Sequence, residues 1–302
     1  MTEVSAHARK AASVRQRLLD RAKARDENYQ LLLDVYAVER LIYRLSISPV
    51  SDRFVLKGAM LFALWFDVPH RPTKDADFLG LGALDAEQLA EIVRTLCVVQ
   101  LDDGLQYDLD SINVAPIRKE ANYDGLRVSL KALIGKARCS VQWDVGFGDA
   151  VNPAAEEVAY PTLLADSPAP SLRVYPRETV FAEKLEAIAK LGLLNSRMKD
   201  YFDLLALAQE NAMDAAQLAQ AIAATFERRA TPLPLDLPVG LTGTFARDAM
   251  KQTQWQAFLG KNRLIAPALG EVVAELAAFS QTALARARQG KSVEPAPVSQ
   301  LQ

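Results

Sequence analysis

The stretch Thr73-Lys74-Asp75-Ala76-Asp77-Phe78 is the part of this 302-residue chain from which its fold can be worked out. Side chains alternate between the two faces of a β-strand, so a strand here places Thr73, Asp75 and Asp77 on one face. Two carboxylates held so close together repel each other unless a cation lies between them. Mg²⁺ prefers such oxygen ligands and completes its shell with water and phosphate oxygens. The pattern alone fits either an acidic strand end that faces water or a Mg²⁺ site with Asp75 and Asp77 as ligands, and the neighbouring segments favour the metal site.

The segment before this strand favours a phosphate site. The apolar run Phe54-Val55-Leu56 leads into Lys57-Gly58, and a glycine lets the backbone approach a ligand closely. Residues 59–66 are expected to form a short helix whose amino end would attract an anion. A phosphate site followed by metal ligands is the arrangement that nucleotidyl transfer needs. The residues predicted to bind the nucleotide in this region are Lys57, Gly58, Ala59, Arg71 and Lys74.

This arrangement resembles the polymerase-β-like nucleotidyltransferases, in which a glycine-rich turn precedes an Asp-x-Asp strand. The longer phrase over residues 54–80 looks like the AbiEii/AbiGii toxin branch of that superfamily. The family usually has Gly-Gly or Gly-Ser at the turn, whereas this chain has Gly58-Ala59 and lacks a hydroxyl that could bind a phosphate. The resemblance implies an α+β fold, in which a polymerase-β-like core with a mixed, largely antiparallel sheet and helices precedes a helical C-terminal half.

A third acidic residue, Asp144, lies within the strand-like run over 138–146. Asp144 points to a glycine-flanked face, and a carboxylate buried there alone would be costly. The residues leave two interpretations open: a salt bridge or exposed edge strand, and a third metal ligand. The resemblance implies the metal ligand, because the superfamily places a third carboxylate on a neighbouring strand. We therefore predict that Asp144 joins Asp75 and Asp77 in a two-metal Mg²⁺ site that could also take Mn²⁺.

Two sequence motifs in the second half of the chain, at residues 183–187 and 199–204, contain further candidate site residues. A helix that opens near Arg177 places Lys184 on its apolar stripe, where a lysine must either snorkel to solvent or meet an anion. Asp200 and Asp203 share one face of the next helix, where the helix dipole alone would also favour acids. In AbiEii-like proteins both motifs contain functional residues, which correspond here to Lys184 and Asp200. The resemblance implies that Lys184 contacts the triphosphate. The predicted catalytic residues are Asp75, Asp77, Asp144, Lys184 and Asp200.

The chain is predicted to divide into four parts. They are N-terminal helices over 1–50, the nucleotidyltransferase sheet over 51–152, a helical C-terminal domain over 153–289 that contributes to the active-site cleft, and a disordered tail over 290–302. Short connections predict antiparallel pairing for the strand-like runs 112–118, 126–134 and 138–146. Helices are expected over 5–25, 27–45 and 86–97 (with Asp85 as N-cap), from 177 and 197, and over 214–229, 242–259 and 267–288.

Composition limits the classes of protein. Half of the residues are apolar and 24% are charged, as in ordinary globular proteins. The net charge of −2 does not indicate nucleic-acid binding, so an RNA contact would need a local patch. The basic helix over 5–25 is a candidate, although a solvated helix face explains its charges better. No apolar run approaches the roughly 20 residues that span a bilayer, so we expect no membrane segment and a cytoplasmic location.

The residues and the resemblance together predict a magnesium-dependent nucleotidyltransferase that attaches NMP from an NTP to an acceptor hydroxyl and expels pyrophosphate. The resemblance also implies a toxin of a type IV toxin–antitoxin, abortive-infection (phage-defence) system. It implies an antitoxin that acts without a stable complex and an RNA acceptor such as the tRNA 3′ end. A protein hydroxyl as acceptor, and a nucleotide-binding module without turnover, remain alternatives. A haloacid-dehalogenase-like phosphatase is excluded, because Leu79 stands where that family needs Thr or Val.

Overall fold

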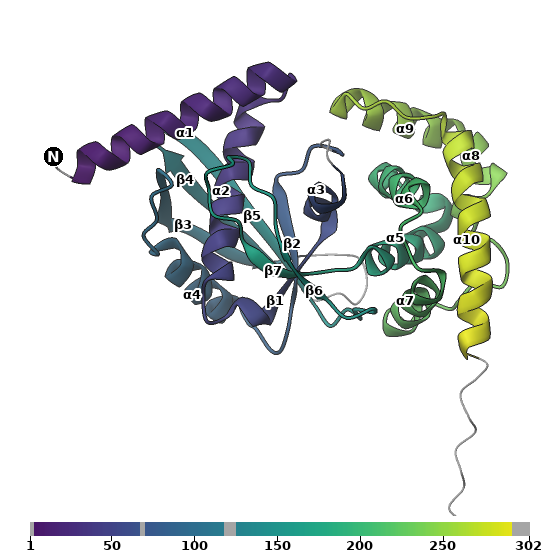
Figure 1. The fold of residues 1–302 in the computed structure, drawn as a ribbon. Coiled ribbons are helices and arrows are strands. Elements are labelled where there is room, and N and C mark those ends of the chain that lie inside the picture. Colours follow the sequence, from purple (N-terminus) through teal and green to yellow (C-terminus); the bar gives the residue numbers. More distant parts are fainter. Residues whose placement is uncertain (1–2, 67–69, 118–124, 292–302) are drawn as a thin grey trace, which may run out of the picture. The chain divides into compact units, whose positions relative to one another are not determined.

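The computed structural model describes residues 3–66, 70–117 and 125–291 (Figure 1). The chain forms two compact units. Unit 1 comprises Met1–Gly148 and Glu156–Val174, and unit 2 comprises Asp149–Ala155 and Tyr175–Gln302. The sheet lies in unit 1, and the C-terminal half is helical. The predicted α+β class, with a mixed and largely antiparallel sheet, is confirmed.

Unit 1 is built on a seven-stranded sheet with the order β3-β4-β5-β2-β1-β7-β6. Neighbours β3, β4 and β5 pair antiparallel, as their short connections predict, whereas β2 pairs with β5 and β1 with β7 in parallel. The strands are β1 (Phe54–Lys57), β2 (Asp75–Gly80), β3 (Leu105–Pro116), β4 (Gly125–Ile134), β5 (Ala137–Phe147), β6 (Glu156–Ala159) and β7 (Ser171–Val174).

The apolar face of this sheet holds the core of unit 1. Phe78 on β2 and Trp143 on β5 are fully buried, with ring centroids 5.0 Å apart. Helix α2 (Tyr29–Ser46) packs on β5, helix α4 (Ala86–Cys97) packs on β3, and α1 (Glu3–Arg25) packs on α2 and β4. Because side chains alternate along a strand, the residues between the buried ones, including those of the Asp-x-Asp pattern, project from the other face.

The predicted start of α4 is confirmed. Asp85 accepts a hydrogen bond from the backbone N–H of Gln88, and the Gln88 side chain accepts one from the backbone of Asp85. This reciprocal capping satisfies amide groups that have no partner within the helix. Cys97 and Cys139 are buried free thiols, as expected for small apolar residues without a spacing motif.

Unit 2 is a bundle in which α10 packs against α6, α7 and α8, and α5 packs against α6 and α7. Its helices are α5 (Arg177–Leu191), α6 (Met198–Glu210), α7 (Ala215–Arg228), α8 (Gly243–Arg247), α9 (Ala249–Asn262) and α10 (Leu269–Lys291). The single helix predicted over 242–259 is wrong, since Asp248 adopts an extended backbone between α8 and α9. Its side chain caps α9 by accepting from the Lys251 N–H.

Two further expectations are corrected. The helix expected over 59–66 is a 3₁₀ turn (Gly58–Leu61) followed by the four-residue helix α3 (Phe62–Trp65). So short a helix carries no useful macrodipole, and the expected attraction of an anion to its amino end is not supported. The region 153–289, expected to be helical, contributes β6 and β7, because Leu172 and Val174 bury their side chains in unit 1.

The C-terminal prediction lies mostly outside the described residues. Helix α10 runs to Lys291, two residues into the tail predicted over 290–302. Among the helices that the structure describes, none is long and apolar enough to cross a membrane.

Candidate active site

Four charged side chains form one row across the polar face of the sheet in unit 1. Lys57 on β1 is the register partner of Asp77 on β2. Asp77 is the partner of Asp144 on β5, which is in turn the partner of Arg127 on β4. Register partners project from the same face, so the row reads cation, carboxylate, carboxylate, cation. Asp75, two residues before Asp77, lies on this face as well. The structure therefore gathers the three predicted metal ligands on one face, beside Arg127, which the sequence analysis missed.

Arg127 binds Asp144 through a two-pronged ion pair. Its Nε donates to Asp144 Oδ1 over 2.8 Å, and its Nη2 donates to Oδ2 over 2.7 Å. Gln142 Nε2 donates a longer bond, 3.4 Å, to the same Oδ1. The Asp144 side chain is 13% exposed and that of Arg127 is 45% exposed. The salt-bridge interpretation of Asp144 is thus correct, and it leaves open whether Asp144 also serves as a metal ligand.

Asp75 is a carboxylate under electrostatic strain. Burial raises its pKa above the ordinary value, and the neighbouring Asp144 and Asp77 raise it further, while Lys74 and Arg127 oppose them. Its Oδ1 is buried and has no hydrogen-bond partner. A buried carboxylate oxygen without a donor costs free energy, which a bound cation would relieve.

The donor set suits a hard cation. Mg²⁺ and Mn²⁺ bind carboxylate oxygens such as those of Asp75, Asp77 and Asp144. One of these oxygens, Asp75 Oδ1, has no hydrogen-bond donor and would gain a partner from a bound cation. In the part of the chain that the structure describes, no group of three or more His, Cys, Asp or Glu side chains is already placed to hold a metal ion. The three-carboxylate site therefore stays a prediction.

Gly58 packs directly against one of these carboxylates. Its φ of +76° lies in the left-handed region, and a Cβ placed there would sit 2.1 Å from Asp77 Oδ2 and 2.8 Å from Asp77 Cβ. The backbone at Gly58 therefore approaches the Asp77 side chain closely and fixes it, while the nucleotide contact expected at Gly58 stays a prediction. Of the other predicted nucleotide contacts, Ala59 is part of the 3₁₀ turn, and Lys74 is exposed immediately before β2. Arg71 lies in the loop before that strand.

Replacing Gly58 by Ala is expected to disturb the site more than the fold. The new methyl group needs both an unfavourable backbone conformation and a displacement of Asp77, so we expect a loss of about 1–3 kcal/mol of stability. Nucleotidyl transfer should fall at least tenfold even at temperatures where the variant is folded. A matched Gly82→Ala variant has φ of +79° but open space around the added Cβ, so it isolates the backbone strain. Equal activity losses in both variants would contradict the proposed contact with Asp77.

The predicted pair Lys184 and Asp200 meets inside unit 2. Lys184 Nζ lies 2.9 Å from Asp200 Oδ1 and 2.8 Å from Asp203 Oδ2. Arg197 Nε binds the other oxygen of Asp200 over 2.6 Å. Both aspartate side chains are fully buried, and only 11% of the Lys184 side chain is exposed. Lys184 thus meets an anion instead of snorkelling, and the anion is a pair of carboxylates from the next helix. The three metal-ligand candidates belong to unit 1 and this pair to unit 2.

Acid is expected to destabilise unit 2 through Asp200. Burial alone would raise the pKa of Asp200, but Lys184 and Arg197 hold that pKa below its ordinary value. Such a carboxyl stabilises the fold above its unfolded-state pKa, about 3.9, and this stability is lost as the pH falls through the lower folded pKa. Circular dichroism should therefore show loss of helix below about pH 4, and Asp200→Asn should flatten the dependence of unfolding free energy on pH there. An unchanged slope would contradict this assignment.

A second buried cluster in unit 2 was missed by the sequence analysis. Arg229 binds Glu183 over 3.1 Å, Glu186 over 3.0 Å and Asp149 over 3.2 Å, and Thr231 donates to Glu186 as well. The Asp149 side chain is 2% exposed. Burial would lower the pKa of Arg229, but the surrounding carboxylates raise it. The cluster ties the segment before β6 to α5 and to the end of α7.

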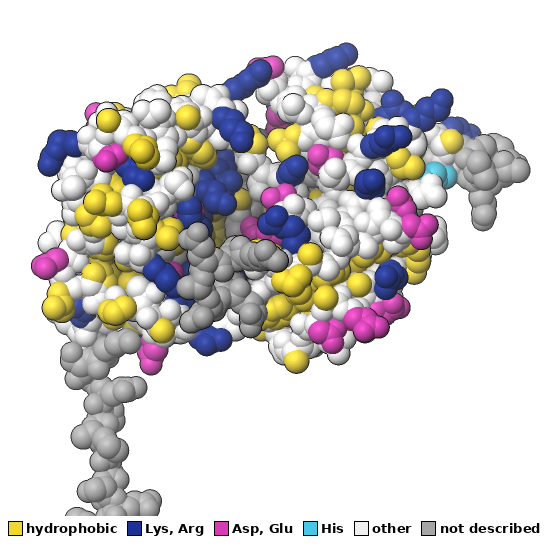
Figure 2. Space-filling view, turned by 180° about the vertical axis from the view of Figure 1, so that it is seen from behind, with side chains coloured by type: hydrophobic (Ala, Val, Ile, Leu, Met, Phe, Trp, Pro, Cys, Tyr) yellow, Lys and Arg dark blue, Asp and Glu magenta, His cyan; other side chains and the backbone are white. Residues whose placement is uncertain are grey.

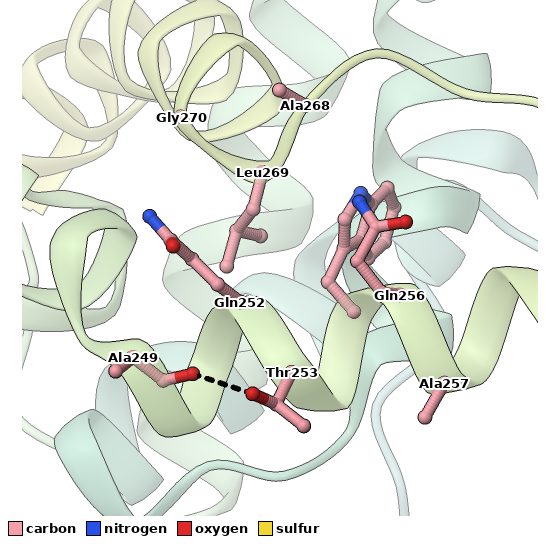
Figure 3. Close-up of a pocket in the computed structure, with 9 residues that line it drawn as sticks. Ala249, Gln252, Thr253, Gln256, Ala257, Ala268, Leu269 and Gly270 are labelled. Atoms are coloured by element: carbon pink, nitrogen blue, oxygen red, sulfur yellow. Dashed lines mark hydrogen bonds between the residues drawn. The ribbon is translucent and has the colours of Figure 1, made fainter.

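A cavity of about 720 Å³ in unit 2 has no predicted site residue in its lining (Figure 3). Its wall is uncharged, and Thr253 uses its hydroxyl to donate to the Ala249 carbonyl within the same helix. The lining residues are Ala249, Gln252, Thr253, Trp255, Gln256, Ala257, Ala268, Leu269 and Gly270. The cavity therefore offers shape and amide groups, but no group for acid–base or metal chemistry.

The basic helix α1 uses several of its charges within unit 1. Lys10 pairs with Asp102, Arg17 with Asp166, and Arg21 with Glu27. Lys and Arg side chains nevertheless stand out from the surface along α1 (Figure 2, upper right), and Arg9, Lys23 and Arg25 are exposed. The paired charges stabilise contacts within unit 1. The exposed charges fit both a solvated helix face and an RNA contact, and the RNA contact stays a prediction.

Comparison with known proteins gives a family. A family model described as "Nucleotidyl transferase AbiEii toxin, Type IV TA system" matches residues 40–282. Among solved structures, the chain is similar to JHP933 from Helicobacter pylori at 15% identity and a TM-score of 0.49, over 86% of this chain and 94% of that one. It is also similar, at 15% identity and a TM-score of 0.47, to an H. pylori protein provisionally called a nucleotidyltransferase, over 87% and 98% of the two chains. No curated protein matches. The family match, and not these distant structures, carries the assignment.

Proposed function

Since the chain belongs to the AbiEii family of nucleotidyltransferase toxins of type IV toxin–antitoxin systems, we propose that it transfers NMP from an NTP to an RNA hydroxyl with the help of Mg²⁺. The observation that carries the proposal is the placement of Asp75, Asp77 and Asp144 on one sheet face. The expected acceptor is an RNA end such as the tRNA 3′ terminus. The family makes an antitoxin partner part of the system, and we propose that it acts without forming a stable complex.

The residues of unit 1 supply the parts of a two-metal site. Bound Mg²⁺ would align the acceptor oxygen with the transferred phosphorus and neutralise the charge that develops there. Asp75, Asp77 and Asp144 would hold the cations, and Gly58 fixes Asp77 through its close contact. Lys57 is the register partner of Asp77 and projects from the same face, and we propose that it contacts phosphate oxygens near the site.

For unit 2 we propose that Lys184 contacts the triphosphate and that Asp200 positions it. Two carboxylates, Asp200 and Asp203, hold the Lys184 ammonium in one place, which removes most of the freedom of a long side chain. A charge fixed in advance binds a phosphate without a further loss of entropy. The family phrases that surround both residues support the same roles.

The test uses NTPs labelled at either the α- or the γ-phosphate, with Mg²⁺ and total RNA. Transfer of NMP predicts that RNA retains the α-label and never the γ-label, because pyrophosphate leaves. A chelator should abolish the reaction, and Mn²⁺ should restore it. Label on protein alone would replace the RNA acceptor by a protein hydroxyl. An NTP that binds but never loses pyrophosphate would leave only a nucleotide-binding module.

A further inference from the structure

The charged row on the sheet includes an arginine, Arg127, that the predicted metal site does not require. Arg127 is built into it by strand register, directly opposite Asp144, and both oxygens of Asp144 accept hydrogen bonds from its guanidinium. No motif of the sequence analysis includes Arg127, and the proposed chemistry has given it no role. Arg127 stands at the end of the row, and its side chain is 45% exposed. It can therefore move without disturbing the buried core.

The ion pair places Arg127 and a cation in competition for the same carboxylate. A guanidinium bound to both oxygens of Asp144 takes one lone pair of each and places a positive charge beside them, which opposes the approach of a metal ion. Arg127 also feels the charge of all three carboxylates, since Asp144, Asp75 and Asp77 each raise its pKa. Arg127 thus offsets part of the negative charge of the three carboxylates in the absence of metal.

We propose that Arg127 is a positioning residue that holds Asp144 until a divalent cation binds, and that its freed guanidinium then binds a phosphate oxygen of the incoming nucleotide. The inference rests on the proposed metal-dependent function and adds an exchange of partners to it. The charges favour this exchange, because a dication replaces a monocation among three carboxylates while a polyanionic triphosphate arrives beside the released arginine. Guanidinium forms the same two-pronged bonds with phosphate as with carboxylate, so little geometry has to change.

The exchange predicts opposite effects of one substitution on two ligands. Arg127→Met removes the competitor, so Mn²⁺ alone should bind about fivefold more tightly, as expected for loss of a half-exposed ion pair. The same variant should bind a non-hydrolysable NTP, in saturating Mn²⁺, several-fold more weakly. Isothermal calorimetry and the electron spin resonance of free Mn²⁺ measure both quantities without turnover. A merely structural role for Arg127 would weaken both ligands.

Two further variants separate charge from geometry. Lys131 lies on the same face of the same strand as Arg127, about 13 Å away at roughly 3.3 Å per residue, which exceeds the Debye length of about 8 Å. Lys131→Met should therefore leave both affinities within twofold. Arg127→Lys keeps the charge but loses the two-pronged bond, so its Mn²⁺ affinity should lie between those of wild type and Arg127→Met.

Mn²⁺ affinity that is unchanged or lower in folded Arg127→Met would overturn the exchange. If wild type still labels RNA in a Mg²⁺-dependent reaction, only this inference fails and the proposed function stands. A wild-type protein that neither binds Mn²⁺ nor labels an acceptor would overturn both. If Arg127→Met does not fold, the Arg127→Lys variant decides, and an affinity for Mn²⁺ equal to or below that of wild type counts against the exchange.

Discussion

Replacing Lys184 by Met is expected to lower the free energy of unfolding by about 3–5 kcal/mol, because it leaves buried carboxylates without their cation. Asp200 and Asp203 are both fully buried and both lie within 2.9 Å of Lys184 Nζ. Arg197 still lies 2.6 Å from Asp200 Oδ2 and can neutralise that carboxylate in the variant. Chemical denaturation followed by circular dichroism measures the change. Lost activity in this variant is therefore informative about nucleotide binding only where the protein is shown to be folded.

Two comparison variants test the cause of this loss. Lys190 is an exposed lysine in the last turn of the same helix, so Lys190→Met should cost less than about 1 kcal/mol. The double variant Lys184→Met/Asp203→Asn also removes one of the two buried carboxylates that paired with Lys184. It should therefore be more stable than Lys184→Met alone. A Lys184→Met protein as stable as Lys190→Met would show that the buried carboxylates do not depend on Lys184.

Replacing Asp77 by Asn is expected to reduce nucleotidyl transfer by about three orders of magnitude, since a metal contributes several kcal/mol to the transition state. The fold should not suffer. Asp75, Asp77 and Asp144 repel one another, so removing one charge should leave the stability of the metal-free protein unchanged or raise it by up to about 1 kcal/mol. Mg²⁺ is expected to raise the melting temperature of the wild type, and this shift should be lost in the variant. Single-turnover kinetics and thermal denaturation measure the two effects.

The control for this variant lies on the same sheet. Asp110 is an exposed acid on β3, and Asp110→Asn removes the same charge away from the row. It should retain full transfer and the full thermal shift with Mg²⁺. If Asp77→Asn lost enough stability to explain its loss of activity by unfolding, the result would contradict a metal role for Asp77 and indicate a structural one.

Much of unit 1 was predictable because its signals are local. Alternation around Asp75 and Asp77, the N-cap at Asp85 and the turn at Gly135-Lys136 each depend on neighbouring residues. The missed residue Arg127 was within reach of the same reasoning. A two-residue turn sets Ile134 opposite Ala137, and counting back along both strands sets Arg127 opposite Asp144. The sequence analysis used the short connection between the runs 126–134 and 138–146 but did not count the register.

Other features depend on contacts that sequence spacing does not encode. Helical period places Lys184 on an inward face, but not which carboxylates it meets there. Asp149 follows a glycine and has the pattern of a turn, while its partner Arg229 lies 80 residues away. The contact between Gly58 and Asp77 depends on how a 3₁₀ turn folds back over β2. Such long-range pairs are set by packing and remain invisible to local pattern.

A crystal structure with Mn²⁺ and a non-hydrolysable NTP tests the central claim most directly, because Mn²⁺ is located by its anomalous scattering. We expect Mn²⁺ at about 2.0–2.3 Å from carboxylate oxygens of Asp75, Asp77 and Asp144. Arg127 should have left Asp144 for a phosphate oxygen. Mn²⁺ bound elsewhere on the chain, with Asp144 still paired to Arg127 and the nucleotide in place, would contradict the account.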